Sequence, residues 1–303
     1  MVFTTLRFLL IIVSSSGNDE LKPSLRQSGY LVHMRLTGYN NPMIRLHINT
    51  TFQPLLAANN LSSYSQIMRT SIGTIIEKDC SRDVRRLNLD GQKLYLKRCR
   101  REKLSSALES YCRGKLAHSK PYKEMLQFRY LSHLDFAVAE VVAAGEELNY
   151  GIPLTGFIIT HEVIGQDLAL VYRAADKNTR RCIMSDFGSL LGRLHDSGFY
   201  GGTRLKDIII DGDPSKSPTL TLIDRETRSP FPRPAGNKRI LARLLLNIRR
   251  QAQQGEIFTT GEWASFSESY CRSLADHFSI GANDLLIKIL AKLEQSGKKY
   301  LAE

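Results

Sequence analysis

Residues 84–98 read Val-Arg-Arg-Leu-Asn-Leu-Asp-Gly-Gln-Lys-Leu-Tyr-Leu-Lys-Arg and carry a clear signal for a pair of strands. Two apolar-rich stretches flank Asp90-Gly91, a dipeptide that favours the type I′ turn of a two-residue β-hairpin. We therefore expect an antiparallel hairpin, with Lys97 near the end of its second strand. Taken singly, a lysine at that position is an ordinary solvated residue.

A helix and several further strands are predicted on the C-terminal side of this hairpin. Apolar residues recur at three-residue steps between Tyr122 and Leu134, which indicates an amphipathic helix that carries Glu124. Beyond Gly165 the apolar period becomes mainly helical. Strands are expected at 138–144, 157–160, 207–210 and 220–223. A strand-rich part followed by a helix-rich part predicts an α+β fold of two lobes.

The patterns divide the chain into three segments. Residues 1–70 show a mixed pattern, with short strands and a short helix around 54–60, and we treat them as an N-terminal extension. Residues 71–165 form the predicted strand-rich N-lobe, and residues 166–303 form the predicted helical C-lobe. The apolar run 8–13 is short for the core of a secretion signal.

Composition narrows the class of protein. The chain has 303 residues, of which 42% are hydrophobic and 24% are charged, as in ordinary globular domains. No apolar run approaches the roughly 18–20 residues of a membrane span. The 42 Lys and Arg against 30 Asp and Glu give a net charge of +12, which favours anionic partners. The five cysteines are widely spaced without a Cys-x-x-Cys pair, so reduced thiols in a cytoplasmic protein are expected.

Four features follow one another in the order that ATP-dependent phosphoryl transfer requires. Lys97 on a strand precedes Glu124 on a helix, and a hinge-like segment at 160–165 precedes Asp224 at the end of an apolar strand. In this chemistry a lysine holds the phosphates, a helix glutamate orients that lysine, and a carboxylate holds the metal ion. The order therefore predicts a nucleotide site.

Six stretches of the chain carry a family resemblance. They are 94–98, 124–131, 139–145, 157–162, 190–198 and 222–225. In these stretches the chain resembles the lipopolysaccharide core kinases, which phosphorylate heptose or the inner Kdo sugar and share the protein-kinase fold. The resemblance covers residues 72–228, roughly half of the chain. It implies ATP and Mg²⁺ as cofactors and transfer of the γ-phosphate to a sugar hydroxyl of a glycolipid.

The resemblance also implies a role for individual residues. Lys97 and Glu124 would form the ion pair that orients ATP. Asp224 would hold the metal ion. Glu162 would mark the hinge, whose backbone rather than its side chain pairs with adenine.

Two further stretches lie at or resemble the phosphate-covering and metal-binding motifs of kinases. The loop 78–84 lies at the place where kinases cover the phosphates, and it contains no glycine. The backbone amides of Ser81 and Arg82 would therefore have to bind the phosphates. The tripeptide Asp186-Phe187-Gly188 spells the Asp-Phe-Gly metal motif, but it lies in a stretch of helical periodicity. We therefore expect Asp186 to be a helix residue and not a metal ligand.

The catalytic loop departs from the family pattern, which is a His-x-Asp followed about five residues later by a metal-binding Asn or His. Aligned from Gly198, the position of the catalytic Asp holds Thr203. Aligned from the strand 208–210, that position holds Gly202 and the Asn position holds Asp207. Threonine cannot accept a substrate proton as a carboxylate does. Thr203 and Asp207 are thus the candidate catalytic positions, and Asp207 is also a candidate metal ligand.

Three functions stay open. The first is an ATP-dependent sugar kinase that acts on the lipopolysaccharide core or another anionic glycolipid. The second is a pseudokinase that binds nucleotide or a protein partner. The third is a basic adaptor for lipid or nucleic acid, and nucleic acid ranks last because no RNP, KH, zinc-finger or helix-turn-helix signature accompanies the charge. The expected location is the cytoplasm, with the inner-membrane surface as an alternative.

Overall fold

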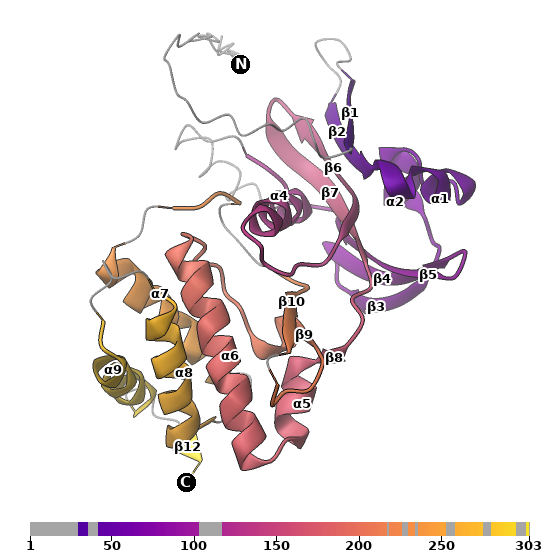
Figure 1. Cartoon of the computed structure of the whole chain (residues 1–303). Coiled ribbons are helices and arrows are strands. Elements are labelled where there is room, and N and C mark those ends of the chain that lie inside the picture. The colour runs from indigo at the N-terminus through magenta and orange to yellow at the C-terminus, as the bar shows by residue number, and fades with distance from the viewer. Residues whose placement is uncertain are drawn as a thin grey trace, which may run out of the picture.

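The computed structural model describes residues 30–35, 42–102, 117–216, 218–225, 230–233, 236–252, 258–274, 280–294 and 301–302. Most of its strands gather at one end of the molecule and most of its helices at the other (Figure 1). The predicted α+β architecture of a strand-rich and a helical part is confirmed. Residues 1–29 and 36–41 of the predicted N-terminal extension lie outside the described residues.

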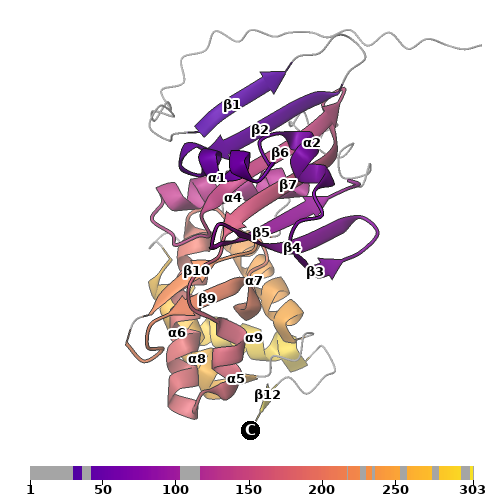
Figure 2. The ribbon, with the colours of Figure 1, turned by 90° about the vertical axis from the view of Figure 1, so that its right-hand side faces the viewer.

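Seven strands form one antiparallel sheet in the order β1-β2-β6-β7-β5-β4-β3 (Figure 2). Strands from the first 70 residues therefore pair directly with strands of the segment 71–165. The strands are β1 (Tyr30–Arg35), β2 (Met43–Asn49), β3 (Thr74–Lys78), β4 (Arg82–Leu89), β5 (Gln92–Cys99), β6 (Val141–Asn149) and β7 (Ile152–His161).

The predicted hairpin is the pair β4 and β5. Its register runs from Arg82 opposite Cys99 to Leu89 opposite Gln92. The turn residues Asp90 and Gly91 have φ values of +50° and +83°, which is the left-handed geometry that a type I′ turn requires at both positions. The hairpin prediction is therefore confirmed in both position and turn type.

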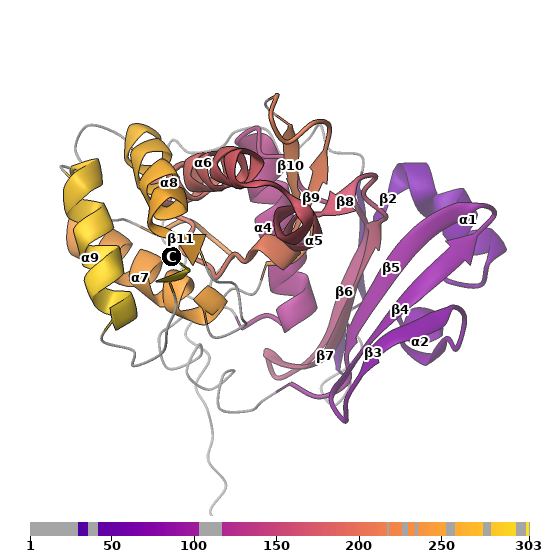
Figure 3. The ribbon, with the colours of Figure 1, turned by 90° about the horizontal axis from the view of Figure 1, so that it is seen from below.

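The two faces of the sheet pack against different helices (Figure 3). Helices α1 (Gln53–Ala58) and α2 (Tyr64–Arg69) cover one face, where Leu94 and Leu96 of β5 are buried. Helix α4 (Lys120–His133) covers part of the other face. Because side chains alternate along a strand, Lys97 belongs to the α4 side of the sheet, which we call the Lys97 face.

The helical part follows β7 and contains most of the remaining core. Of the described residues, none lies in a helix long and apolar enough to cross a membrane. The elements of the helical part are β8 (Gln166–Asp167), α5 (Leu168–Ala174), α6 (Lys177–Asp196), the 3-10 helix η2 (Leu205–Asp207), β9 (Ile208–Asp211), β10 (Thr219–Leu222), α7 (Asn237–Ala252), β11 (Phe258–Thr259), α8 (Thr260–Arg272), α9 (Ala282–Glu294) and β12 (Leu301–Ala302). A further 3-10 helix, η1 (Thr50–Phe52), precedes α1 in the strand-rich part.

The expected strand at 138–144 begins later than the sequence indicated. Strand β6 starts at Val141, because Val138 forms a parallel bridge with Leu222 of β10 instead. The N–H of Ala139 donates to the carbonyl of Leu222 at 2.9 Å, and the N–H of Leu222 donates to Ala137 at 3.0 Å. These bonds hold the end of β10 against the strand-rich part. Asp224, two residues after β10, is placed by them.

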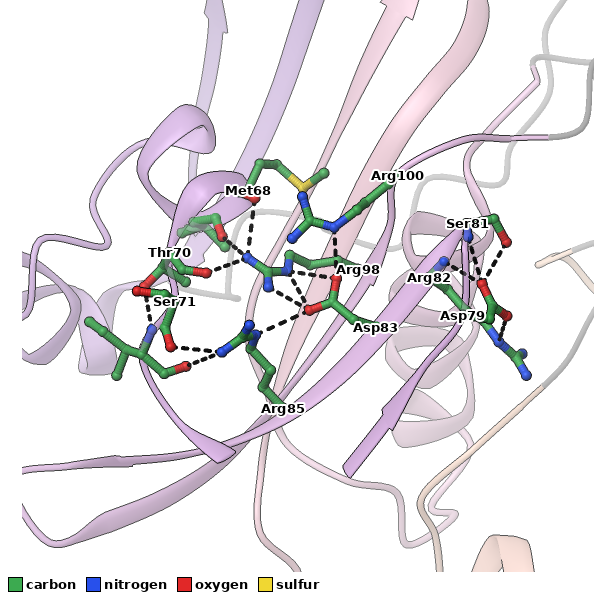
Figure 4. Close-up of polar contacts among 12 residues, drawn as sticks. Met68, Thr70, Ser71, Asp79, Ser81, Arg82, Asp83, Arg85, Arg98 and Arg100 are labelled. Atoms are coloured by element: carbon green, nitrogen blue, oxygen red, sulfur yellow. Dashed lines mark hydrogen bonds and ion pairs between the residues drawn. The ribbon is translucent and has the colours of Figure 1, made fainter. Parts of the chain in front are cut away.

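A buried cluster of charges ties α2 to the sheet (Figure 4). The carboxylate of Asp83 accepts hydrogen bonds from Arg98, from Arg100 at 2.9 Å and from Arg85 at 3.2 Å. Arg98 is completely buried and also donates to the carbonyls of Ile67, Met68 and Thr70 at the end of α2, at 2.7–3.1 Å. The guanidinium thus satisfies the carbonyls that a helix leaves open at its C-terminus.

Replacing Asp83 with Asn should lower the free energy of unfolding at pH 7 by roughly 3–5 kcal/mol, because it leaves the buried Arg98 without its counter-charge. Burial alone would raise the pKa of Asp83, but the hydrogen bonds and charges of Arg98 and Arg100 hold it below its usual range. A depressed carboxyl pKa stabilises the fold above its unfolded pKa of about 3.9, and this contribution is lost as the pH falls through the folded value.

Urea unfolding at several pH values tests this assignment. The difference between wild type and Asp83→Asn should shrink as the pH falls from about 5 toward 3. The control is Asp90→Asn, which keeps a dipeptide that favours the same turn and should change stability little. Equal stability of wild type and Asp83→Asn at pH 7 would contradict the role given to the cluster.

Candidate functional site

Lys97, Glu124 and Asp224, which the sequence singled out, lie together on the Lys97 face. The Nζ atom of Lys97 in β5 lies 2.8 Å from Oε1 of Glu124 in α4 and 3.4 Å from Oδ1 of Asp224. It also donates to the carbonyl of Ile223 at 3.3 Å. The strand, the helix and the end of β10 therefore meet at one ammonium group.

The two carboxylates differ in their exposure to solvent. The side chain of Glu124 is 9% exposed, whereas that of Asp224 is 43% exposed. Burial raises the pKa of Glu124 to about 7, although Lys97 and the backbone N–H of Arg225 stabilise its ionised form. Burial would lower the pKa of Lys97, but the charges of Glu124 and Asp224 outweigh it and raise that pKa, so the lysine stays protonated. The arrangement can present a cation and an exposed carboxylate to a ligand.

Helix α4 is held at its N-terminus by the buried carboxylate of Glu146 in β6. This carboxylate accepts from the backbone N–H of Ser119 at 2.8 Å, lies 2.8 Å from Nδ1 of His118, and pairs with Arg45 of β2 at 3.1 Å. Ser119 is the N-cap of α4, and it fits against Gly156 of β7, where a Cβ atom would collide with it. These contacts set the position of Glu124, which lies in the second turn of the helix.

Asp207 lies in η2, directly before β9, and its carboxylate is already engaged. The guanidinium of Arg204 donates to both oxygens at 2.8 Å, and the backbone N–H of Arg204 donates at 2.9 Å. Burial raises the pKa of Asp207. The sequence places Arg204 three residues before Asp207, but the local pattern did not indicate that the two side chains pair.

Thr203 is buried and accepts a hydrogen bond from Nη1 of Arg225. Arg225 follows Asp224 and is itself completely buried, and burial lowers its pKa to about 10. In the two alignments of the catalytic loop, the position of the expected Asp holds Thr203 or Gly202, and neither has a carboxylate. Thr203 and Asp207 are the two candidate catalytic residues from the sequence. Arg225 engages the first and Arg204 the second.

Among the described residues, no group of three or more His, Cys, Asp or Glu side chains could hold a metal ion by itself. Mg²⁺ usually binds through one or two carboxylates together with phosphate oxygens. Asp224, half-exposed and beside Lys97, fits that requirement. Asp207 could bind Mg²⁺ only after its ion pair with Arg204 is broken.

Glu162, the predicted hinge marker, follows β7 and is tied to the hairpin. Its carboxylate lies 2.7 Å from Nη2 of Arg86, 3.1 Å from the hydroxyl of Tyr95 and 3.5 Å from Nζ of Lys93. Its backbone N–H donates to the carbonyl of Lys93 at 2.9 Å. Sequence reasoning missed Tyr95, although its two-residue spacing from Lys97 places both on one face of a strand.

The turn between β3 and β4 does not offer free amides to a phosphate. The backbone N–H groups of Ser81 and Arg82 both donate to Oδ1 of Asp79, at 2.6 and 2.7 Å (Figure 4). The expectation that these amides cover the phosphates overlooked Asp79, whose short side chain caps its own turn. A phosphate could use them only by displacing this carboxylate.

No protein-family model matches the chain, and no curated protein matches it. Among solved structures, the chain is similar to WaaP, a lipopolysaccharide core heptose kinase, in a complex with acyl carrier protein. The TM-score is 0.61 and the identity 18%, over 85% of this chain and 100% of that chain. The bifunctional kinase-methyltransferase WbdD gives a TM-score of 0.37 and 15% identity, over 71% of this chain and 43% of that chain. The similarity to WaaP confirms the kinase-like fold that the resemblance implied.

The anchoring of α4 can be tested without changing any charge. Gly156→Ala should push Ser119 outward, shift the N-terminus of α4 and loosen the contact between Glu124 and Lys97, at a cost of about 1–3 kcal/mol in stability. The pKa of Lys97 should then fall. Site-resolved mass spectrometry should find that Lys97 reacts severalfold faster with an amine-acylating reagent.

The double variant Gly156→Ala/Ser119→Gly removes the colliding atoms and should return the reactivity of Lys97 toward the wild-type value. Gly236→Ala is the control, since a Cβ at Gly236 meets no atom within 4 Å. Unchanged acylation of Lys97 in Gly156→Ala would show that the N-terminus of α4 does not position the ion pair.

Proposed function

We propose that this chain is a kinase-like phosphotransferase that binds ATP with Mg²⁺ at Lys97, Glu124 and Asp224. The observation that carries the proposal is the ammonium group of Lys97, held by one buried and one half-exposed carboxylate from two distant parts of the chain. Lys97 would hold the phosphates, and Glu124 would keep Lys97 in place. Asp224 would hold Mg²⁺, which when bound neutralises charge on the phosphate oxygens.

The proposed acceptor is a sugar hydroxyl of the lipopolysaccharide core or of another anionic glycolipid. The similarity in fold to WaaP and the net charge of +12 support this choice. A surplus of positive charge raises the local concentration of anionic substrates and draws a protein to anionic membrane surfaces. We therefore propose that the protein works at the cytoplasmic surface of the inner membrane.

A second candidate is a kinase-fold protein that binds nucleotide without transferring phosphate efficiently. A specific observation favours it: the hydroxyl of Thr203 accepts from Arg225, and the carboxylate of Asp207 is bound twice by the Arg204 side chain. A general base must reach the substrate hydroxyl in a state that accepts a proton. In this conformation Asp207 is committed to Arg204, and transfer would require the loop to rearrange.

ATP with Mg²⁺ should raise the melting temperature of the protein by several degrees. At a ligand concentration of about 100 times the Kd, binding stabilises the folded state by about 2.7 kcal/mol. Lys97→Ala should abolish this shift, because the phosphates lose their cation. The control is Lys216→Ala, an exposed lysine paired with Asp213 in the loop between β9 and β10. A shift in Lys97→Ala equal to that of wild type would refute the assignment of Lys97.

Asp224→Asn should remove the Mg²⁺-dependent part of the ATP shift and leave the Mg²⁺-independent part. The amide keeps the size of the side chain but lacks the negative charge that a hard cation prefers. Melting scans with ATP, with and without Mg²⁺, measure this directly. An unchanged response to Mg²⁺ would count against Asp224 as the metal ligand. A stabilising shift without ATP turnover on glycolipid acceptors would favour the second candidate.

A further inference from the structure

Three side chains of β5 follow one another along the Lys97 face. Lys93, Tyr95 and Lys97 are spaced by two residues, so they point to the same side of the sheet. Lys93 and Tyr95 both reach the carboxylate of Glu162, whereas Lys97 reaches Glu124. Tyr95 thus lies between the proposed phosphate-binding lysine and the segment that follows β7.

The hydroxyl of Tyr95 links the strand to that segment. It donates to Oε1 of Glu162 at 3.1 Å, and Arg86, which is opposite Tyr95 in the neighbouring strand, binds the same oxygen at 2.7 Å. The backbone N–H of Glu162 is bonded to Lys93. The phenol ring is therefore fixed at both ends, by its own strand and by Glu162.

The next residue, Val163, offers a main chain that could pair with a ligand. Within the parts of the chain that the structure describes, no hydrogen bond engages its backbone N–H or C=O. Consecutive same-face residues on a strand lie about 6.6–6.8 Å apart. A ligand that touches both the Val163 main chain and the ammonium of Lys97 must therefore pass over the position of Tyr95.

We propose that Tyr95 is a gate that closes the base end of the nucleotide site and must turn away before a nucleotide can bind. This inference rests on the proposed function, because it assumes that a nucleotide reaches from Lys97 to the segment after β7. Opening the gate breaks the hydrogen bond to Glu162. The apparent affinity is then reduced by the fraction of molecules in which the gate is open.

Removing the gate should tighten nucleotide binding. A hydrogen bond to a charged group contributes enough to keep the open form a minor species, so Tyr95→Ala should bind ATP at least about tenfold more tightly than wild type. Tyr95→Phe keeps the ring but loses the same bond to Glu162, so it should tighten binding by nearly as much. Tyr150→Ala is the matched control, because Tyr150 is an exposed tyrosine in the turn between β6 and β7.

Isothermal titration of ATP with Mg²⁺ into these four proteins measures the affinities without any assay of turnover. Tighter binding by Tyr95→Ala and Tyr95→Phe, with Tyr150→Ala equal to wild type, supports the gate. Binding by Tyr95→Ala alone, with none by wild type, also supports it. Should Tyr95→Ala fail to fold in melting scans without ligand, Tyr95→Phe decides the question by itself.

Two results overturn the gate in different ways. If wild type binds ATP and neither Tyr95 variant binds it more tightly, the gate is wrong and the proposed function stands. Weaker binding by Tyr95→Ala would show instead that the ring supports the base, as aromatic rings do when they stack on it. If no protein of the series binds ATP, the proposed function fails and the gate fails with it.

Discussion

The ammonium group of Lys97 is shared by two carboxylates from distant elements, Glu124 of the helix α4 and Asp224 beyond β10. An ion pair that is partly withdrawn from water is favourable only when its partners are held in good geometry. The strand, the helix and the end of β10 therefore have to keep fixed positions relative to one another. The contacts of Glu146 with the start of α4, and the bonds between β10 and residues 137–139 just before β6, supply those constraints.

Strand β5 serves the core and the site at once because its side chains alternate between two faces. Leu94, Leu96 and Arg98 face α1 and α2, where the guanidinium of Arg98 binds the end of α2. Tyr95 and Lys97 face the proposed ligand. A register slip by one residue would exchange the two sets, so the same hydrophobic pattern that stabilises the sheet also aims the lysine.

The loop before β9 is the part of the site that differs from the family pattern. Arg204 and Arg225 engage Asp207 and Thr203, and Arg225 is buried directly beyond Asp224. Buried polar groups are costly unless they are paired, and Arg225 is paired only in part: its Nη1 donates to Thr203, while its Nε and Nη2 are buried without a hydrogen-bond partner among the described residues. The structure thus brings together the three residues proposed to bind nucleotide, whereas the two residues proposed to activate an acceptor hydroxyl are engaged by arginines.

Local pattern was enough to predict the β4–β5 hairpin, the helix carrying Glu124, the helical setting of Asp186 and the order of lysine, glutamate and aspartate, because strand and helix periods and turn chemistry are written in neighbouring residues. The meeting of Lys97, Glu124 and Asp224 in space was expected from a resemblance, and only the fold shows it. The capture of the Ser81 and Arg82 amides by Asp79 and the pairing of Asp207 with Arg204 are local contacts that sequence reasoning missed. The later start of β6, the hydrogen bond from Arg225 to Thr203 and the reach of Tyr95 to Glu162 were decided by tertiary structure. Each of these three joins residues far apart in the chain, and such pairings cannot be read from the spacing of neighbouring residues in a single sequence.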